Sequence, residues 1–280
     1  MAKPQPWTVG GFKFLGGSVA GVSTCVIMPE YSLCFDLGPG LESSVPMEHF
    51  FVTHAHLDHA AGIPYIISLK TLNKTKSPIF YLNETMLEPM HEIMNQWMKM
   101  EGHQYDFEFR SVGLGEDIPL NNETFVRVFP TVHRVRSQGY TLFRKNKKLK
   151  PEYRHLKPAE IIELKQKNID FEDHLEEPLV SFTGDTKIDF LAKSEAHKAR
   201  VLFMEVTYLD EKKPISVARE WGHLHLDELV EKIESIEAQK IAIMHISRRY
   251  SPQEARRIIL NRIPKQHHQR IFVVPPFGAP

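Results

Sequence analysis

The stretch Thr53-His54-Ala55-His56-Leu57-Asp58-His59 contains three imidazoles and one carboxylate within six residues. These side chains hold zinc and other borderline divalent metals in proteins. The stretch follows an apolar run at residues 49–52 that predicts a buried strand, and precedes a helix-like run at residues 60–72. A loop at a strand's end is held rigidly by the sheet, as a metal site requires. The sequence therefore predicts a metal-binding loop; the alternative is a solvated, histidine-rich loop with one incidental carboxylate.

Three further metal-binding side chains stand where predicted strands end. They are His133, Asp185 and His245, which follow strands predicted at residues 125–129, 179–182 and 241–244. A single histidine at a strand end is more often structural. Three such positions, added to the loop, point to side chains that converge at one edge of a sheet. We therefore expect all three to be metal ligands.

The rest of the chain alternates strand and helix patterns, which predicts an α/β fold. Short apolar runs broken by Gly, Pro and Ser at residues 12–15, 24–28 and 33–36 predict a β-meander. Methionines and aromatics at helical spacing predict an amphipathic helix over residues 83–100 that packs on the core. The remaining predicted elements are strands at 108–111, 139–143, 201–204 and 271–274 and helices at 157–165, at 226–238 and from Pro252. Because no long linker interrupts this pattern, we predict a single domain spanning residues 1–280.

The composition is that of an ordinary globular protein: 42% of the 280 residues are hydrophobic and 25% are charged. The 35 basic and 35 acidic residues cancel, so a polyanionic partner requires a local basic patch. The sequence contains no apolar run of membrane-spanning length, and residues 1–17 lack the apolar core of a signal peptide. A cytoplasmic location without membrane association is expected, with an organelle not excluded. Cys25 and Cys34 lie in apolar runs and are expected to be buried thiols rather than a disulfide or zinc ligands.

Residues 144–157 form the one compositional break in the chain. They include seven Lys or Arg residues and a single acid, Glu152, and an acidic stretch follows at residues 170–177. The basic residues are Arg144, Lys145, Lys147, Lys148, Lys150, Arg154 and Lys157. A charge run is usually a solvated face, and the composition alone favours that reading.

The His-x-His-x-Asp-His motif after a strand resembles the metal motif of the metallo-β-lactamase superfamily. The later motifs resemble those of one branch, the tRNase Z family, whose members trim the 3′ end of precursor tRNA. The resemblance extends over nearly the whole chain and is closest to the short, plant-type form. It implies an αββα sandwich, in which two mixed sheets are flanked by helices.

The resemblance also implies a centre for two metal ions. One metal would be held by His54, His56 and His133, the other by Asp58, His59 and His245, and Asp185 would bridge them. Two Zn²⁺ are expected for a donor set rich in imidazole, with Mn²⁺ or Fe²⁺ possible. Asp36, at a Gly turn after a predicted strand, is either a simple turn former or a carboxylate that supports the histidine loop.

Two later motifs, Met204-Glu205-Val206-Thr207 and Trp221-Gly222-His223-Leu224-His225, imply the proton-transfer groups. His223 would be the general acid, Glu205 would orient its ring, and Asp58 would accept the proton of the nucleophile. The alternatives are His225 as the acid, or a surface loop in which neither histidine is catalytic. The motif His245-Ile246-Ser247-Arg248-Arg249-Tyr250 implies phosphate contacts by Ser247 and Arg249.

In the tRNase Z family an excursion between the third and fourth motifs grips the tRNA. Residues 144–177 fall in that interval, so the resemblance favours a small basic tRNA-binding arm over a merely solvated face. The chain departs from the bacterial pattern because it has no long Gly/Pro-rich arm and no Pro-x-Lys-x-Arg-Asn loop near residues 21–25. A homodimer, in which one subunit's arm serves the other's active site, is implied by the family alone.

The combined prediction is a metal-dependent endoribonuclease that removes the 3′ trailer from precursor tRNA and leaves a 3′-hydroxyl on the tRNA. One alternative is a two-metal hydrolase of small phosphodiesters or esters. Another is a non-catalytic RNA-binding or scaffold protein on the same fold.

Overall fold

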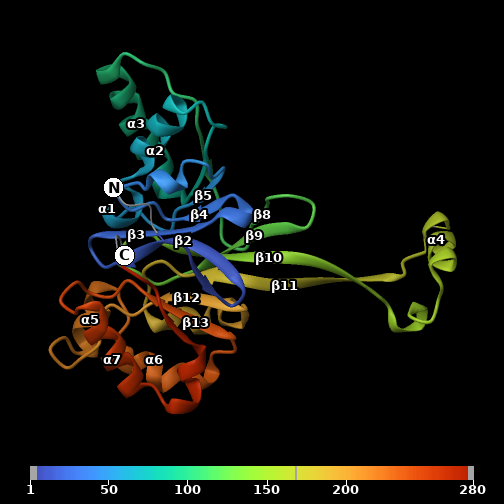
Figure 1. The fold of residues 1–280 in the computed structure, drawn as a ribbon. Coiled ribbons are helices and arrows are strands. Elements are labelled where there is room, and N and C mark those ends of the chain that lie inside the picture. Colours follow the sequence, from blue (N-terminus) through green and yellow to red (C-terminus); the bar gives the residue numbers. More distant parts are fainter. Residues whose placement is uncertain (1–4, 168, 277–280) are drawn as a thin grey trace.

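The computed structural model describes residues 5–167 and 169–276, so the two ends of the predicted 1–280 domain lie outside the described residues. Two seven-stranded sheets pack face to face (Figure 1). The first contains, in spatial order, β1 (Trp7–Val9), β2 (Phe12–Val19), β3 (Ser23–Met28), β4 (Leu33–Phe35), β5 (His49–Phe51), β6 (Ile79–Leu82) and β7 (Glu108–Ser111). The second contains β14 (Ile271–Val273), β13 (Lys240–Met244), β12 (Val201–Glu205), β11 (Glu172–Phe182), β10 (Gln138–Leu149), β9 (Thr124–Pro130) and β8 (Asp117–Pro119).

Both sheets are mixed, and they are built alike. In each sheet, the first four strands in chain order pair antiparallel with their neighbours. The fourth to the seventh strands pair parallel. The helices flanking the sheets are α1 (Leu57–Ala60), α2 (Ile63–Leu72), α3 (Glu84–Glu101), α5 (Ile215–Trp221), α6 (Leu226–Lys232) and α7 (Pro252–Arg262). The predicted arrangement of two mixed sheets flanked by helices is confirmed.

Three apolar cores hold the layers together. One lies between the sheets, one between the first sheet and α2 and α3, and one between the second sheet and α6 and α7. Strand β5 shows how one strand serves two of them: Phe51 faces the core between the sheets, and Phe50 faces the helices. Because both sheets share one core, we propose that the chain is a single domain.

Most predicted elements are confirmed, but some differ in length from the prediction. Helix α3 begins after Asn83, whose side-chain oxygen accepts a hydrogen bond from Thr85 N, and ends at Gly102 in the left-handed conformation. The helix predicted over residues 226–238 is too long, because α6 ends at Lys232 and tightens into a 3-10 turn, Ile233–Ser235. Cys25 and Cys34 are buried, free thiols, as predicted.

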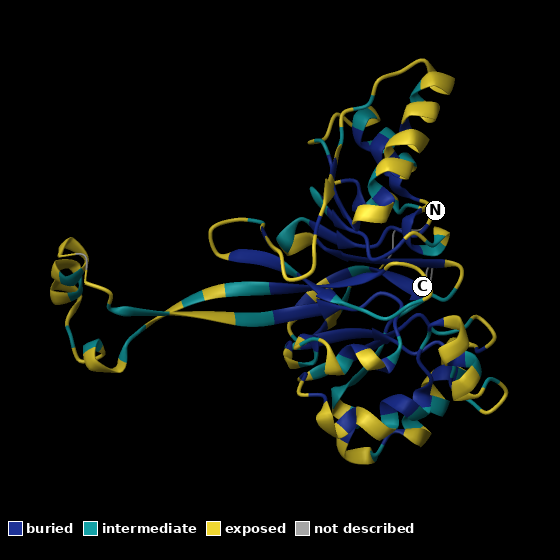
Figure 2. Cartoon of the chain, turned by 180° about the vertical axis from the view of Figure 1, so that it is seen from behind, coloured by how far each residue is buried: buried dark blue, intermediate teal, exposed yellow. Residues whose placement is uncertain are grey.

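An arm projects from the second sheet as a twisted two-stranded ribbon (Figure 1). The strand predicted at residues 139–143 is longer than expected, because β10 continues to Leu149 and pairs with β11 from Tyr140 onward. The tip carries the short helix α4 (Pro158–Gln166), close to the predicted bounds. Figure 2 shows that burial falls along the ribbon from the body to the tip. In the described part of the chain, no helix is both long and apolar enough to span a membrane.

Lys70 is a buried cation in the layer between the first sheet and α2. The residue is 2% exposed, and its ammonium donates hydrogen bonds to the carbonyls of Val45 (2.8 Å) and Met47 (2.7 Å). Burial lowers the pKa of Lys70 to about 8. In the unfolded chain the amine keeps its ordinary pKa, so between pH 8 and 10.5 the unfolded state binds more protons than the folded one.

We therefore expect the wild type to gain stability relative to Lys70→Met as the pH rises from 8 to 10.5. The expected gain is up to about 3 kcal/mol. Denaturant unfolding of both proteins at several pH values measures it. A Lys99→Met variant on exposed α3 is the control and should follow the wild type. A pH-independent difference between wild type and Lys70→Met would contradict the prediction.

Candidate metal centre

The histidine-rich loop is anchored by a carboxylate at the end of β4. Asp36 has a positive φ of 50° and turns its side chain under the loop, where Oδ1 accepts a hydrogen bond from Thr53 N (2.8 Å). Its other oxygen accepts a hydrogen bond from His59 Nδ1 at 2.7 Å. Asp36 is therefore the buried support of the loop, not only a turn former.

The loop contributes two side chains to a first cluster. The donor atoms of His54, His56, His133 and Asp185 all lie within 4.8 Å of one another. His56 Nδ1 lies 3.0 Å from His54 Nε2 and 3.3 Å from His133 Nε2. Asp185 Oδ2 lies 3.7 Å from His54 Nε2.

A second cluster adjoins the first and contains Asp58, His59 and His245. His245 Nε2 lies 3.3 Å from His59 Nε2 and 3.3 Å from Asp58 Oδ2. Asp185 stands between the clusters, because its Oδ1 is 3.4 Å from His59 Nε2 and 3.3 Å from His245 Nε2. All seven predicted ligands therefore lie together, although they are spread from residue 54 to residue 245.

The backbone before Asp185 explains how it reaches the loop. Gly184 has a φ of 60°, and a Cβ there would lie 2.5 Å from Thr53 Oγ1. Only glycine lets the end of β11 pack this closely against the histidine loop.

Four of the five imidazoles are oriented by a hydrogen bond from the nitrogen that points away from the clusters. His54 Nδ1 donates to Thr53 Oγ1 (3.0 Å), and His59 Nδ1 donates to Asp36 (2.7 Å). His133 Nδ1 donates to the Gly222 carbonyl (2.8 Å), and His245 Nδ1 donates to Thr207 Oγ1 (3.0 Å). Such bonds leave the Nε2 lone pairs facing inward. The sequence did not reveal Thr53, Thr207 or Gly222 as partners, since only the folded chain brings them to the rings.

The distances between the inward-facing atoms fit a shared metal. Ligand atoms at about 2.0–2.1 Å from one tetrahedral Zn²⁺ lie about 3.4 Å from each other. The shortest separations within the clusters run from 3.0 to 3.7 Å, and all lie within 4.8 Å. Among the described residues, the buried Asp185 Oδ1 has no hydrogen-bond partner, as expected of an atom reserved for a cation.

The electrostatics of the clusters also suit a cation. Burial lowers the pKa values of His54, His56 and His133, which keeps these rings neutral and able to ligate. Burial opposes the ionisation of Asp58, but the neighbouring His245 and His59 hold its pKa at about 2. Burial would likewise lower the pKa of His59, yet Asp185 and Asp36 raise it well above its usual value. The carboxylates thus concentrate negative charge where a metal would sit.

His223 and Glu205 lie at the edge of the clusters. His223 Nδ1 donates to Glu205 Oε1 at 2.9 Å, and its ring lies 5.2 Å from that of His133 and 5.3 Å from that of His245, centroid to centroid. Burial would lower the pKa of His223, but the Glu205 carboxylate raises it to about 9. The His223 side chain is 15% exposed, so its Nε2, which is not bonded to Glu205, can reach a ligand.

His225 points elsewhere. It precedes α6, where Nδ1 accepts a hydrogen bond from Asp227 N (3.1 Å) and Nε2 donates to the Asp210 carbonyl (3.2 Å). Both ring nitrogens are occupied by backbone groups, so His225 acts as a helix cap. The geometry therefore favours His223 over its rival.

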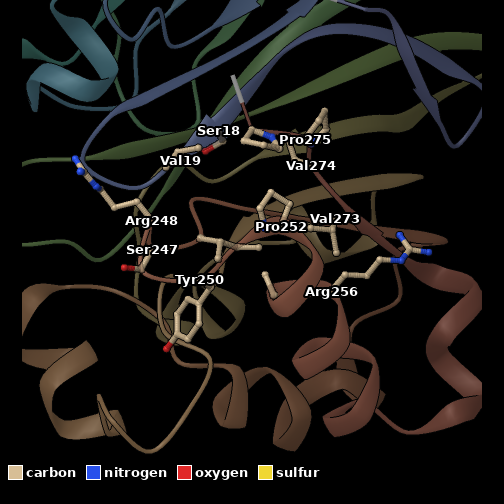
Figure 3. A pocket seen from close by; sticks show the side chains of 13 residues that line it. Ser18, Val19, Ser247, Arg248, Tyr250, Pro252, Arg256, Val273, Val274 and Pro275 are labelled. Carbon is tan, nitrogen blue, oxygen red and sulfur yellow. The ribbon is translucent and has the colours of Figure 1, made fainter. Parts of the chain in front are cut away.

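The predicted phosphate-binding residues follow His245. Ser247 N donates to the Thr207 carbonyl (3.0 Å), and Arg249 Nε donates to Ser247 Oγ (3.1 Å) while its guanidinium lies over Tyr208. Ser247 also lines a cavity of about 420 Å³ beside the clusters, with Arg248 and Arg256 at opposite sides (Figure 3). This cavity adjoins the centre through Ser18, whose Oγ accepts a hydrogen bond from His245 N (2.9 Å).

Of the seven predicted basic residues, Arg144 and Lys145 contact Tyr31 and Phe125 at the base of the ribbon, and the other five lie farther out along the arm. Gln138 N, at the start of β10, donates to the Thr53 carbonyl, and the strand then runs outward for 12 residues, about 40 Å. Lys147 pairs with Glu172 (3.1 Å) and Lys150 with Asp170 (2.8 Å). Local sequence patterns do not predict this partial neutralisation by β11.

A comparison of the sequence with protein-family models finds no match. The chain is 30% identical to tRNase Z TRZ1 of Arabidopsis thaliana over 277 residues, which cover 98% of this chain and 99% of that one. The chain belongs to the tRNase Z family. The solved structure of the short form of human tRNase Z superimposes with a TM-score of 0.60 at 16% identity and covers 93% of this chain and 95% of its own. The metallo-β-lactamase fold protein YhfI of Bacillus subtilis gives a TM-score of 0.59 at 13% identity, with 94% and 95% covered. This tRNase Z family member therefore has the metallo-β-lactamase fold, and the predicted family is confirmed.

Proposed function

We propose that the chain is a metal-dependent endoribonuclease that cleaves the 3′ trailer from precursor tRNA and leaves a 3′-hydroxyl on the tRNA. Membership of the tRNase Z family supports the substrate. The observation that carries the chemistry is the meeting of seven histidine and aspartate side chains in two clusters that share Asp185, beside the His223–Glu205 pair.

Two Zn²⁺ per subunit are the cofactors we propose, and Mn²⁺ or Fe²⁺ suits the same donors. His54, His56 and His133 would hold one ion, Asp58, His59 and His245 the other, and Asp185 both. Bound divalent cations would lower the pKa of a water molecule and neutralise the charge of the scissile phosphate.

The chain's own residues supply the proton transfers. The leaving group is the ribose 3′-oxygen, which leaves poorly unless it is protonated. His223 is protonated at neutral pH, and Nε2 is free to give its proton to this oxygen while Glu205 stabilises the charged ring. Asp58 receives the nucleophile's proton; with a pKa of about 2 it can only relay that proton onward.

Ser247 and Arg249 would bind phosphate oxygens of the substrate on the His245 side of the centre. The guanidinium offers two parallel donors to a phosphate, and the hydroxyl offers one. Their hydrogen bond to each other keeps both groups at the mouth of the site.

The arm is the part of the molecule that we propose binds the tRNA body. Its tip lies about 40 Å along β10 from the clusters, so it can contact a long substrate at a distance from the cut. Residues 144–177 contain nine basic and eight acidic residues, so the arm as a whole is close to neutral. Among the described residues, five of the seven predicted basic residues form no ion pair, but Arg144 contacts Tyr31 and Lys145 lies over Phe125 on the body. The other three, Lys148, Arg154 and Lys157, are therefore left for phosphate contacts.

A variant with Lys148, Arg154 and Lys157 changed to alanine is expected to bind precursor tRNA more weakly. The slope of log affinity against log salt should become flatter by about 2 to 3, since each lost phosphate contact removes about 0.7–0.9. The matched control changes three exposed lysines on the body to alanine: Lys74, Lys99 and Lys265. An unchanged slope for the arm variant would remove the arm from the interface.

A homodimer is part of this proposal. The outward direction of the arm leaves it unable to fold back onto its own centre without breaking the β10–β11 ladder, whereas it could reach the substrate held by a second subunit. Sedimentation of the purified chain tests the oligomeric state.

The deciding experiment incubates the purified chain with a 3′-extended precursor tRNA, with and without a chelator, and maps the cut. We expect one cut after the tRNA's 3′ side, abolished by the chelator. Turnover of a small chromogenic phosphodiester without cleavage of the tRNA would instead favour the alternative hydrolase.

A further inference from the structure

An exposed arginine–tryptophan pair stands beside the metal-ligand clusters. The Arg134 guanidinium lies over the Trp221 indole at 4.7 Å from the ring centroid. Trp221 ends helix α5 and is 50% exposed, and Arg134 is exposed as well. Neither residue has a role in the chemistry proposed above.

The backbone ties this pair to the reacting groups. Arg134 directly follows His133, and Trp221 is separated from His223 only by Gly222. The Gly222 carbonyl accepts the hydrogen bond from His133 Nδ1, at 2.8 Å. Gly222 has a φ of 80°, and a Cβ there would lie 2.7 Å from that nitrogen. The two chain segments thus meet in close contact, so the pair holds a definite position relative to His223.

The surroundings of the indole differ from those of the other tryptophans. Trp7 is stacked between Phe14 and Phe272, where it contributes to the core. Trp97 is 43% exposed on α3, in the layer beyond the first sheet. Trp221 alone is both exposed and next to the clusters, and one face of its ring is already covered by a cation.

An aromatic ring backed by arginine is a surface on which nucleic-acid bases stack. Unpaired bases stack on aromatic side chains and on guanidinium planes, and the arginine charge also attracts the adjacent phosphate. Arg249 over Tyr208 forms a second such pair, with the Tyr208 and His223 ring centroids 6.3 Å apart. One arginine–aromatic pair thus lies beside the His223 ring, and Trp221 of the Arg134–Trp221 pair is two residues from His223 along the chain.

We propose that Trp221 and Arg134 form a stacking subsite for the base of an unpaired nucleotide next to the scissile phosphate. This subsite rests on the proposed endoribonuclease function, since it deepens the description of how that substrate is held. It makes the precise position of the cut depend on a base that the proton-transfer groups do not touch.

The first test measures binding. A single-stranded RNA oligonucleotide should quench the tryptophan fluorescence of the metal-loaded wild type. The quenching should disappear in Trp221→Phe and persist in Trp97→Phe, the matched control with similar exposure. Equal quenching in both variants would overturn the subsite.

The second test measures cleavage of precursor tRNA. Trp221→Ala should raise KM roughly 5- to 100-fold, as expected for the loss of one base–aromatic stack, while Trp221→Phe should recover most of it. Turnover of methyl p-nitrophenyl phosphate, which has no base, should stay at the wild-type rate in both variants. A parallel loss on this small substrate would assign Trp221 a structural role and refute the proposal.

A substrate change isolates the contact further. An abasic nucleotide beside the scissile phosphate should raise KM for the wild type, and it should add nothing in Trp221→Ala. If the abasic nucleotide and Trp221→Ala raise KM additively at both positions flanking the scissile phosphate, stacking on Trp221 is refuted. If the wild type quenches with RNA through Trp221 but cleaves no precursor tRNA, the endoribonuclease proposal fails, and Trp221 remains only a stacking site for an RNA base.

Discussion

Changing Asp185 to asparagine is expected to reduce cleavage of precursor tRNA by more than 100-fold and to lower the metal bound per chain. Asparagine keeps the volume of the side chain but removes its charge, and it cannot offer two equivalent oxygens to both clusters. Loss of a partner outside the ligand shell typically costs 10- to 100-fold, so loss of the shared ligand should exceed that range. Elemental analysis after dialysis and the rise in Tm on adding Zn²⁺ measure the metal independently of activity.

Two comparisons make this result specific. Asp117→Asn, at an exposed salt bridge with Arg127 near the β8 edge of the second sheet, should leave metal content and cleavage unchanged. His54→Ala should also abolish cleavage, while tRNA binding through the arm persists. Full metal content and near wild-type cleavage in Asp185→Asn would show that the clusters are not the catalytic centre.

The residues that converge on this centre could be predicted because each follows a buried strand. Strands β5 and β13 and the inner end of β11, residues 179–182, are short apolar runs, and polar side chains directly after them end at one edge of the sandwich. The sequence is compatible with two roles for Asp36, because a carboxylate before a Gly turn is also an ordinary turn former. Its hydrogen bonds to Thr53 and His59 decide the matter, and these exist only in the folded chain.

The arm shows where sequence patterns fail. The outer half of β10, residues 144–149, is basic or polar at every position except Leu149, so it lacks the apolar period that identifies a half-buried strand. Its extended conformation depends on pairing with the acidic outer half of β11, for example Lys145 opposite Glu176 and Lys148 opposite Asp173. A cross-strand partner some 30 residues away is invisible to local patterns. For the same reason, local patterns do not predict the contact between Arg134 and Trp221, which lie 87 positions apart.

Changing His223 to alanine is expected to lower kcat for precursor tRNA by about 10²- to 10⁴-fold, the usual contribution of a positioned general acid. The effect should depend on the leaving group. A substrate with a bridging 3′-sulfur has a leaving group that needs no proton, so the variant and the wild type should cleave it at similar rates. Metal content should stay unchanged, because the seven proposed ligands remain.

The comparison with His225→Asn separates the two histidines of the motif. Asparagine also caps helices well, so this variant should keep its fold and its rate on both substrates. His225 is held by Asp227 N and the Asp210 carbonyl and so has no proton to give the substrate, whereas His223 is kept charged by Glu205 beside the centre. If the 3′-sulfur substrate rescued His225→Asn and not His223→Ala, the proton donor would be His225, and the bond between His223 and Glu205 would have only a structural role.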